Sequence, residues 1–347
     1  MKILVTGGAG YIGSHSCIEL AASNHQVVIL DNLCNASLVS IARAEKLAGT
    51  RFPLHRIDLR DGEAVHRLFE REHFDAVVHF AALKAVGESV EKPLDYYDNN
   101  VVGSIHLLQA MRAHGCKRLV FSSSATVYGN PDSVPVNEDA PLRVTNPYGR
   151  TKLVTEDMIR DACAADPQFS AILLRYFNPV GAHPSGEIGE DPRGIPNNLM
   201  PYICQVAVGR RDHLGVFGGD WPTVDGTGVR DYIHVVDLAR AHADAINALE
   251  YARHPATTLN LGTGQGISVL QLVRAFEQAR VRAFEQASGR KVPCEIVARR
   301  AGDVAAVYAD PRRAKEVIGW QAARGVDEMC VDAWRWQSRN PEGYGAA

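Results

Sequence analysis

Residues Thr6 to Gly13 read TGGAGYIG and follow directly on the apolar run Ile3 to Thr6. Their spacing satisfies both GxxGxxG from Gly7 and GxGxxG from Gly8. Glycines so placed allow a tight turn between a strand and a helix, and they let backbone amides approach a pyrophosphate at the helix N-terminus. The stretch therefore predicts a dinucleotide-binding unit, with a plain strand-to-helix turn as the alternative.

Short β-branched runs alternate with longer helical stretches through the first half of the chain. The runs are apolar on both faces, which is typical of a parallel sheet covered by helices on each side. We therefore predict a Rossmann-type, doubly wound parallel α/β sheet with helices on both faces. The expected strands are Ile3 to Thr6, Val27 to Leu30, Phe52 to Arg56, Ala76 to Phe80, Leu119 to Ser122 and Ala171 to Arg175.

The local composition changes after Phe177, where Asn, Pro and Gly residues replace the periodic elements. We predict a dinucleotide-binding domain over residues 1–176 and a smaller α+β substrate-binding domain over residues 177–347. Residues 228–250 again have the pattern of a strand and a helix. The chain is therefore expected to rejoin the first domain there.

Composition limits the kinds of partner. The 347 residues are 46% hydrophobic and 22% charged, with a formal net charge of -3, so no basic stripe favours nucleic acid or a membrane surface. The apolar run at the N-terminus is too short for a signal peptide or a membrane span. Seven scattered cysteines without a CxxC pair indicate reduced thiols in a cytoplasmic protein rather than a disulfide framework or a zinc site. Small molecules are the expected partners.

Asp31 adds to the evidence for a dinucleotide site. It ends the strand Val27 to Leu30, 18 residues beyond Gly13, where a carboxylate would accept hydrogen bonds from the adenosine ribose hydroxyls. A carboxylate there repels a 2′-phosphate, so NAD is favoured over NADP. Asp58 follows the third strand and is a candidate for the adenine edge, with a solvated turn aspartate as the alternative.

Three residues form a candidate catalytic group. Ser124 follows the strand Leu119 to Phe121, and Tyr148 and Lys152 lie one helical turn apart. An ammonium beside a phenol favours the phenolate, so Lys152 is expected to lower the tyrosine pKa from its usual value of about 10. Tyr148 would then act as a general base, with Ser124 hydrogen-bonding the same substrate oxygen. The alternative is a solvent-facing pair and a turn-capping serine.

Five further stretches carry a family resemblance, and they lie in both halves of the chain. The sequence resembles the extended short-chain dehydrogenase/reductases and, more narrowly, the UDP-glucose 4-epimerases, over essentially its whole length. The stretches are DNLCN at 31–35, HFAALKAVGESV at 79–90, YYDNNV at 96–101, SSSATVYG at 122–129 and RYFNPVGAHPSG at 175–186.

The resemblance implies two sets of binding residues. The NAD set is Gly7, Gly10, Tyr11, Ile12, Gly13, Asp31, Asn32, Asn35, Asp58, Leu59, Phe80, Ala81, Lys84, Asn99, Tyr148, Lys152 and Tyr176. The UDP-hexose set is Ser124, Tyr148, Phe177, Asn178, Asn198, Leu199, Phe217, Arg230, Tyr232, Arg300, Asp303 and Val307. The two arginines would pair with the diphosphate, whereas surface salt bridges are the alternative for both.

The implied reaction interconverts UDP-glucose and UDP-galactose. Tyr148, assisted by Ser124, would take the proton from the sugar O4 while the C4 hydride passes to NAD, and the 4-keto sugar would turn before the hydride returns. Val307 stands where some family members have tyrosine, and its small side chain implies additional activity on UDP-GlcNAc and UDP-GalNAc. The family also implies a homodimer, formed as a four-helix bundle by the helices beginning near Asn99 and Lys152.

Two other functions compete with this interpretation. A nucleotide-sugar dehydratase or decarboxylase would begin with the same oxidation, but a 4,6-dehydratase usually carries Asp-Glu where this chain has Ser124-Ala125. A decarboxylase should bring a further basic residue for the substrate carboxylate, and none stands out. A non-catalytic dinucleotide-sensing regulator is the alternative from another class, and the retained Tyr148 and Lys152 count against it.

A tandem repeat departs from the family pattern. Residues 273–280 read VRAFEQAR and residues 281–288 read VRAFEQAS. Eight residues rotate a helix by about 80° beyond two full turns, so Phe276 and Phe284 cannot occupy equivalent positions on one face. We expect a helix lengthened by two turns, with one copy overhanging the core.

Overall fold

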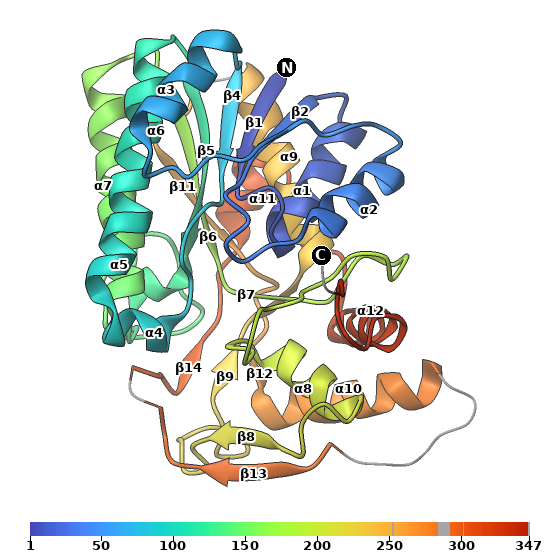
Figure 1. Ribbon diagram of the computed structural model, residues 1–347. Helices are drawn as coiled ribbons and strands as arrows, with labels where there is room; N and C mark the ends of the chain where they lie inside the picture. Colours follow the sequence, from blue (N-terminus) through green and yellow to red (C-terminus); the bar gives the residue numbers. More distant parts are fainter. Residues whose placement is uncertain (252, 284–291, 301, 346–347) are drawn as a thin grey trace.

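The computed structural model describes residues 1–251, 253–283, 292–300 and 302–345. A large twisted sheet lies between two layers of helices, and a smaller group of helices and short strands lies beyond one end of the sheet (Figure 1). The predicted α/β architecture is therefore confirmed.

The large sheet has seven strands in the order β11-β6-β5-β4-β1-β2-β3, and all its pairs are parallel. The strand order changes direction between β1 and β4, which is where ligands bind in open α/β sheets, at the carboxyl ends of the strands. The strands are β1 (Lys2–Thr6), β2 (Gln26–Leu30), β3 (Leu54–His55), β4 (Ala76–His79), β5 (Arg118–Ser124), β6 (Ser170–Tyr176) and β11 (Thr257–Leu261).

Alternate residues of the strands face two separate hydrophobic cores, as the period of a strand requires. Ile3 and Val5 lie in one core, whereas Leu4 between them lies in the other. The first core is closed by α1 (Tyr11–Ala22), α2 (Leu38–Ala48), α9 (Val235–Tyr251) and α11 (Arg312–Ile318). The second is closed by α3 (Gly62–Arg71), α6 (Gly103–Ala113) and α7 (Pro147–Ala165).

Two strands differ from the sequence expectation. β3 has two residues rather than the five expected, because Pro53 has no N–H for the ladder and contributes only its carbonyl, which accepts from Ile29. β11 was not foreseen, and it extends the sheet beyond β6. Helix α9 packs against α1 and β11 joins the large sheet, so these two elements return to the first domain.

The smaller group is built around a third hydrophobic core. Three helices close this core, and Phe276 meets Trp334 there edge to face, with 5.9 Å between the ring centroids. The helices are α8 (Leu199–Ala207), α10 (Val269–Ala283) and α12 (Val326–Arg339). The short strands are β7 (Asn178–Val180), β8 (Leu214–Phe217), β9 (Val229–Arg230), β10 (Tyr232–His234), β12 (Ile267–Ser268), β13 (Cys294–Val297) and β14 (Ala306–Val307).

The remaining elements precede α6 or follow β5. They are α4 (Val86–Glu91), α5 (Pro93–Tyr97), the π-helical turn η1 (Asp98–Val102) and the 3-10 turn η2 (Ala125–Tyr128). Among the described residues, no helix is long and apolar enough to cross a membrane.

The tandem repeat is described only in part. Helix α10 contains the whole first copy and the first three residues of the second, and Phe276 of the first copy is buried. Phe284 and the rest of the second copy lie outside the described residues, so the expected two-turn extension remains a prediction.

Candidate active site

The glycine turn between β1 and α1 closes against the backbone that follows β4. Gly7 has a φ of +71°, and a Cβ on it would lie 2.7 Å from the amide nitrogen of Ala81. A Cβ on Gly13 would lie 2.2 Å from the carbonyl oxygen of Gly7. Gly10 is the N-cap of α1 and supplies no side-chain cap. The turn therefore leaves the amide end of α1 open to an anion, as a bound pyrophosphate requires.

Asp31 ties the glycine turn to the end of β2. Its carboxylate accepts from the amide of Ala9 at 3.1 Å and from that of Leu33 at 2.8 Å. Burial raises the pKa of Asp31, and these two hydrogen bonds oppose the shift. The carboxylate retains acceptor capacity for ribose hydroxyls, because each oxygen can accept more than one hydrogen bond.

Three of the predicted NAD residues, Asn32, Asp58 and Leu59, follow the ends of β2 and β3. The amide of Asn32 donates to Asp58 at 2.9 Å, and Arg60 pairs with Asp58 at the same distance. The hydrogen bond from Arg60 holds the pKa of Asp58 well below its usual range. Leu59 is buried against Gly103 in the second core, so only its backbone is available to a ligand.

The other NAD candidates lie along the carboxyl edge between β4 and β6. Phe80 follows β4, with its ring centroid 4.6 Å from that of His242, and the hydroxyl of Tyr176 is hydrogen-bonded to the same histidine. Lys84 donates to Glu190 at 3.1 Å. Tyr11 donates to the carbonyl of Gly181, Ile12 packs beside the first core, and Asn99 donates to Asn100.

The three proposed catalytic residues converge at one point. Ser124 ends β5 and caps η2, where its hydroxyl accepts from the amide of Thr126 at 3.2 Å. Tyr148 stands in the first turn of α7, with its phenol close enough to the Ser124 hydroxyl for the two side chains to interact. Lys152 is buried one turn further along α7, where its ammonium donates to the carbonyl oxygen of Ser122 at 2.6 Å. The strand end and the helix start thus place a hydroxyl, a phenol and an ammonium at the carboxyl edge of the sheet.

The expected direction of the tyrosine shift is not found in the chain alone. Burial raises the pKa of Tyr148, and the hydrogen bond with Ser124 only partly opposes that rise. Burial also lowers the pKa of Lys152 to about 7, with the charge of Glu156 acting in the opposite direction. Desolvation therefore outweighs the effect that we expected from the lysine.

Four predicted nucleotide residues form a second cluster, in the smaller domain. Arg300 donates to Asp303 at 2.8 Å, and its guanidinium carbon lies 5.5 Å from the ring centroid of Phe217. Arg230 lies 3.9 Å from the same Asp303 carboxylate, and burial lowers its pKa. Two guanidinium groups and an aromatic ring therefore lie together, a set suited to a diphosphate and a flat base.

Val307 links this cluster to the catalytic end of the sheet. It pairs with Arg230 in the parallel ladder of β14 and β9. Its side chain packs against the hydrophobic cluster that contains Phe177 and Val127, and Ala125, the residue after Ser124, packs against the same cluster. Val307 and the segment that follows Ser124 therefore share one hydrophobic cluster.

The remaining substrate candidates lie on β7, on β10 and at the start of α8. Asn178 begins β7 and donates its amide N–H to the carbonyl of Asp231 at 2.9 Å, while Tyr232 is buried in β10. Asn198 is the N-cap of α8 and donates to Glu190 at 2.7 Å, with Leu199 following it.

Similarity to known proteins extends over the whole chain. A family model described as GDP-mannose 4,6 dehydratase matches residues 4–333. The UDP-glucose 4-epimerase of Bacillus subtilis (strain 168) is 55% identical over 347 residues, 100% of each chain. This chain belongs to the UDP-glucose 4-epimerase family.

Solved structures of that family share the fold. The UDP-glucose 4-epimerase from Bifidobacterium longum, in complex with NAD+ and UDP, is 47% identical with a TM-score of 0.94, covering 99% of this chain and all of the other. A UDP-Glc/GlcNAc 4-epimerase from Campylobacter jejuni is 37% identical with a TM-score of 0.82, covering 97% and 99% of the two chains.

A buried ion pair behind the epimerase site was missed by the sequence reasoning. Arg175 of β6 makes a two-pronged contact with Glu156 of α7, at 2.9 and 2.6 Å. Ser123 of β5 donates to the same carboxylate. The pair fixes α7 against the two strands and so fixes Tyr148 and Lys152. A lone Glu four residues after Lys152 and an Arg inside an apolar strand were the available signals.

Lys152 predicts a pH dependence of stability in the cofactor-free epimerase. Its pKa of about 7 in the folded chain lies below the value of about 10.4 for an unfolded lysine. Between these values the unfolded chain binds more protons, so the free energy of unfolding should rise with pH, by at most about 1.4 kcal/mol per pH unit. Chemical denaturation of the wild type and Lys152→Met, from about pH 7 to about pH 10, should show a growing advantage for the wild type. A difference in stability between the two proteins that stays constant over this pH range would contradict the lowered pKa of Lys152.

Proposed function

We propose that this protein is an NAD-dependent isomerase that interconverts UDP-glucose and UDP-galactose through a 4-keto intermediate. The observation that carries the proposal is the placement of Ser124, Tyr148 and Lys152 together at the carboxyl edge of the sheet that also carries the open N-terminus of α1. Full-length identity of about 55% with UDP-glucose 4-epimerases supports the assignment of substrate and reaction.

Each domain would bind a different ligand. Residues 1–176, together with α9 and β11, would bind NAD, and the other residues of 177–347 would bind the UDP-sugar. Arg230 and Arg300 would hold the diphosphate, with Phe217 against the uracil. With the nucleotide held by these residues, the hexose would be the part of the ligand that turns.

Tyr148 would take the proton from the sugar O4, with Ser124 hydrogen-bonded to both the phenol and that oxygen. The Gly7–Gly13 turn and Asp31 suit a dinucleotide, because the open helix end would hold the pyrophosphate and the carboxylate would accept from the ribose hydroxyls. NAD, when bound, supplies the acceptor and donor of the C4 hydride, and its positive ring favours the phenolate. The buried Tyr148 would then be a base only in the loaded enzyme.

The test of this function needs no added cofactor. Purified protein is mixed with UDP-galactose alone, and the nucleotide sugars are separated after the reaction. We expect UDP-glucose to appear, because the hydride taken from C4 returns to C4 and the NAD is not consumed. The supernatant of the denatured protein should contain NAD. Absence of UDP-glucose, with NAD present, would refute the reaction.

A dehydratase remains the alternative, since the matching family model carries that description. It would eliminate water from UDP-glucose and leave a 4-keto-6-deoxy sugar. Ser124-Ala125 occupy the place of the acidic pair that this elimination would use, which favours epimerisation. The same separation of nucleotide sugars distinguishes the two products.

We further propose activity on UDP-GlcNAc and UDP-GalNAc. Val307 is small, lies beside Phe177 and leaves room for a 2-acetamido group. The Campylobacter jejuni neighbour, described as a UDP-Glc/GlcNAc 4-epimerase, supports this breadth.

We also propose that the protein is a cytoplasmic homodimer. Val90, Leu94 and Tyr97 follow one another at near-helical spacing on α4 and α5, and Leu94 is 79% exposed. These helices pack beside α7 (Figure 1). The corresponding helices of a second copy would cover these three side chains and complete a four-helix bundle. All seven cysteines are free thiols, as in a reducing compartment. Light scattering should give twice the 37.8 kDa chain mass, and Leu94→Glu should halve it.

A further inference from the structure

One segment of the smaller domain reaches back across the first domain. Residues 189–198, which we call the strap, run from the loop after β7 to the N-cap of α8. Two of its side chains contact loops that carry proposed NAD residues. The Arg193 contact lies outside the sites described above, and the Glu190 contact adjoins them through Lys84 and Asn198.

Arg193 makes the first contact. Its guanidinium donates to the carbonyl oxygen of Cys34 at 3.1 Å and to that of Ala36 at 2.8 Å. These carbonyls flank Asn35, a proposed NAD residue, in the loop after β2. One planar guanidinium thus bridges the loop on both sides of Asn35, through hydrogen bonds from a charged donor.

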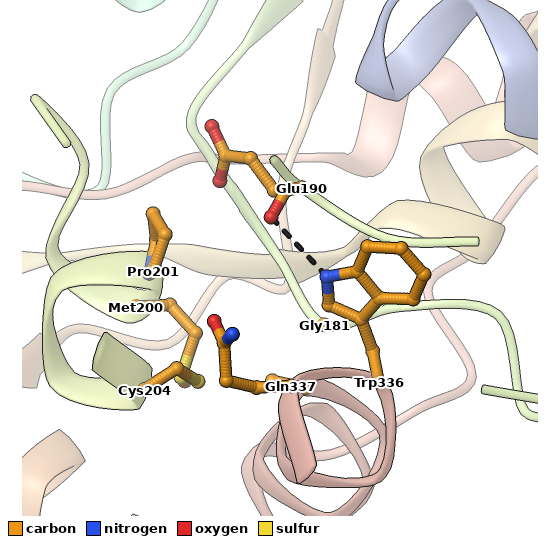
Figure 2. A pocket seen from close by; sticks show the side chains of 8 residues that line it. Gly181, Glu190, Met200, Pro201, Cys204, Trp336 and Gln337 are labelled. Carbon is orange, nitrogen blue, oxygen red and sulfur yellow. Dashed lines mark hydrogen bonds between the residues drawn. The ribbon is translucent and has the colours of Figure 1, made fainter. Parts of the chain in front are cut away.

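Glu190 makes the second contact. One carboxylate oxygen accepts from Lys84 at 3.1 Å and from Asn198 at 2.7 Å. The backbone carbonyl of Glu190 accepts from the indole of Trp336, and Figure 2 shows the carboxyl group extending away from that indole. The backbone of the strap is therefore bonded to α12 at Glu190, while the Glu190 side chain holds Lys84 of the first domain.

We propose that the strap is a latch that retains the dinucleotide, with Arg193 as the positioning residue that closes it. This inference rests on the proposed function, because it takes Asn35 and Lys84 as neighbours of NAD. We place the dinucleotide against the loop after β2 through Asn35, so its release would require that loop to move, and Arg193 ties the loop to the other domain. An isomerase that returns its hydride gains from such retention, since it never exchanges its cofactor.

The test measures release of NAD from the holoenzyme. Protein loaded with isotopically labelled NAD is chased with excess unlabelled NAD, and the retained label is followed over time. Arg193→Ala should release NAD about tenfold faster, as expected for the loss of hydrogen bonds from a charged donor. Arg193→Lys should fall between the two, because a single ammonium cannot span both carbonyls as a fork does.

Arg210→Ala is the matched control. Arg210 is also exposed, and it donates to a backbone carbonyl, that of Pro341, away from the NAD loops. It should release NAD at the wild-type rate. Amide exchange of residues 34–36 should rise in Arg193→Ala while the unfolding midpoint stays unchanged, which separates positioning from general stability.

Release from Arg193→Ala at the wild-type rate would overturn the latch, and it would leave the proposed function standing if UDP-galactose is still converted. Equal acceleration in Arg210→Ala would overturn it as well. Wild-type protein that neither holds NAD nor converts UDP-galactose would instead refute the function and, with it, the latch.

Discussion

Tyr148→Phe should lower kcat for UDP-galactose by about 10³-fold, within the range that a positioned general base contributes. The phenol lies beside Ser124 at the end of β5, where we propose that the sugar O4 is bound. The ring of the variant fills the same space, so binding of NAD and of UDP should be retained. The measurements are kcat by separation of the sugars and NAD content after denaturation.

Tyr251→Phe is the control for this loss of activity, because Tyr251 is 84% exposed at the end of α9 and lies away from the carboxyl edge of the sheet. Its kcat should match that of the wild type. Turnover in Tyr148→Phe within a few fold of the wild type would eliminate Tyr148 as the base.

Val307→Tyr should abolish most activity on UDP-GlcNAc and spare activity on UDP-galactose. The added ring would enter the space beside Phe177 that we assign to the 2-acetamido group. We expect kcat/KM for UDP-GlcNAc to fall about 100-fold, as for other pockets that discriminate by size, while the value for UDP-galactose changes by less than about threefold.

Val307→Ala is the control, since it keeps the space open and should leave both substrates active. Equal loss on both substrates in Val307→Tyr would show a general disturbance of β14 instead of selection by size. Retention of UDP-GlcNAc activity in that variant would place the acetamido pocket elsewhere.

Most of the main sheet could be predicted because each strand from β1 to β6 leaves a local signal. Leu4 points to one core and its neighbours Ile3 and Val5 to the other, so the strand is apolar throughout. β11 gave no such signal as a return strand, since its partner β6 lies some 80 positions earlier in the chain. Pairing at that separation is decided by packing of α9 on α1, which no local pattern shows.

The local geometry of some proposed site residues was predictable where a motif carries it. The glycine turn joins one strand to one helix, Asp31 ends one strand, and Tyr148 and Lys152 lie one turn apart on one helix. The contact between Glu156 and Arg175 was not predictable, because it joins a helix to the next strand through two ordinary residues. The direction of the Tyr148 pKa shift was missed for a related reason: spacing reveals neighbours but not burial.

The short ladder of β9 and β14 has a consequence for how this enzyme can diversify. Val307 is paired in register with Arg230. In our proposal Val307 determines which sugar fits, and Arg230 binds the diphosphate. A backbone displacement that enlarges the space at one partner also moves the other. New sugar preferences should therefore arise by side-chain exchange at Val307 rather than by loop insertion, because remodelling the ladder would sacrifice nucleotide affinity along with selectivity.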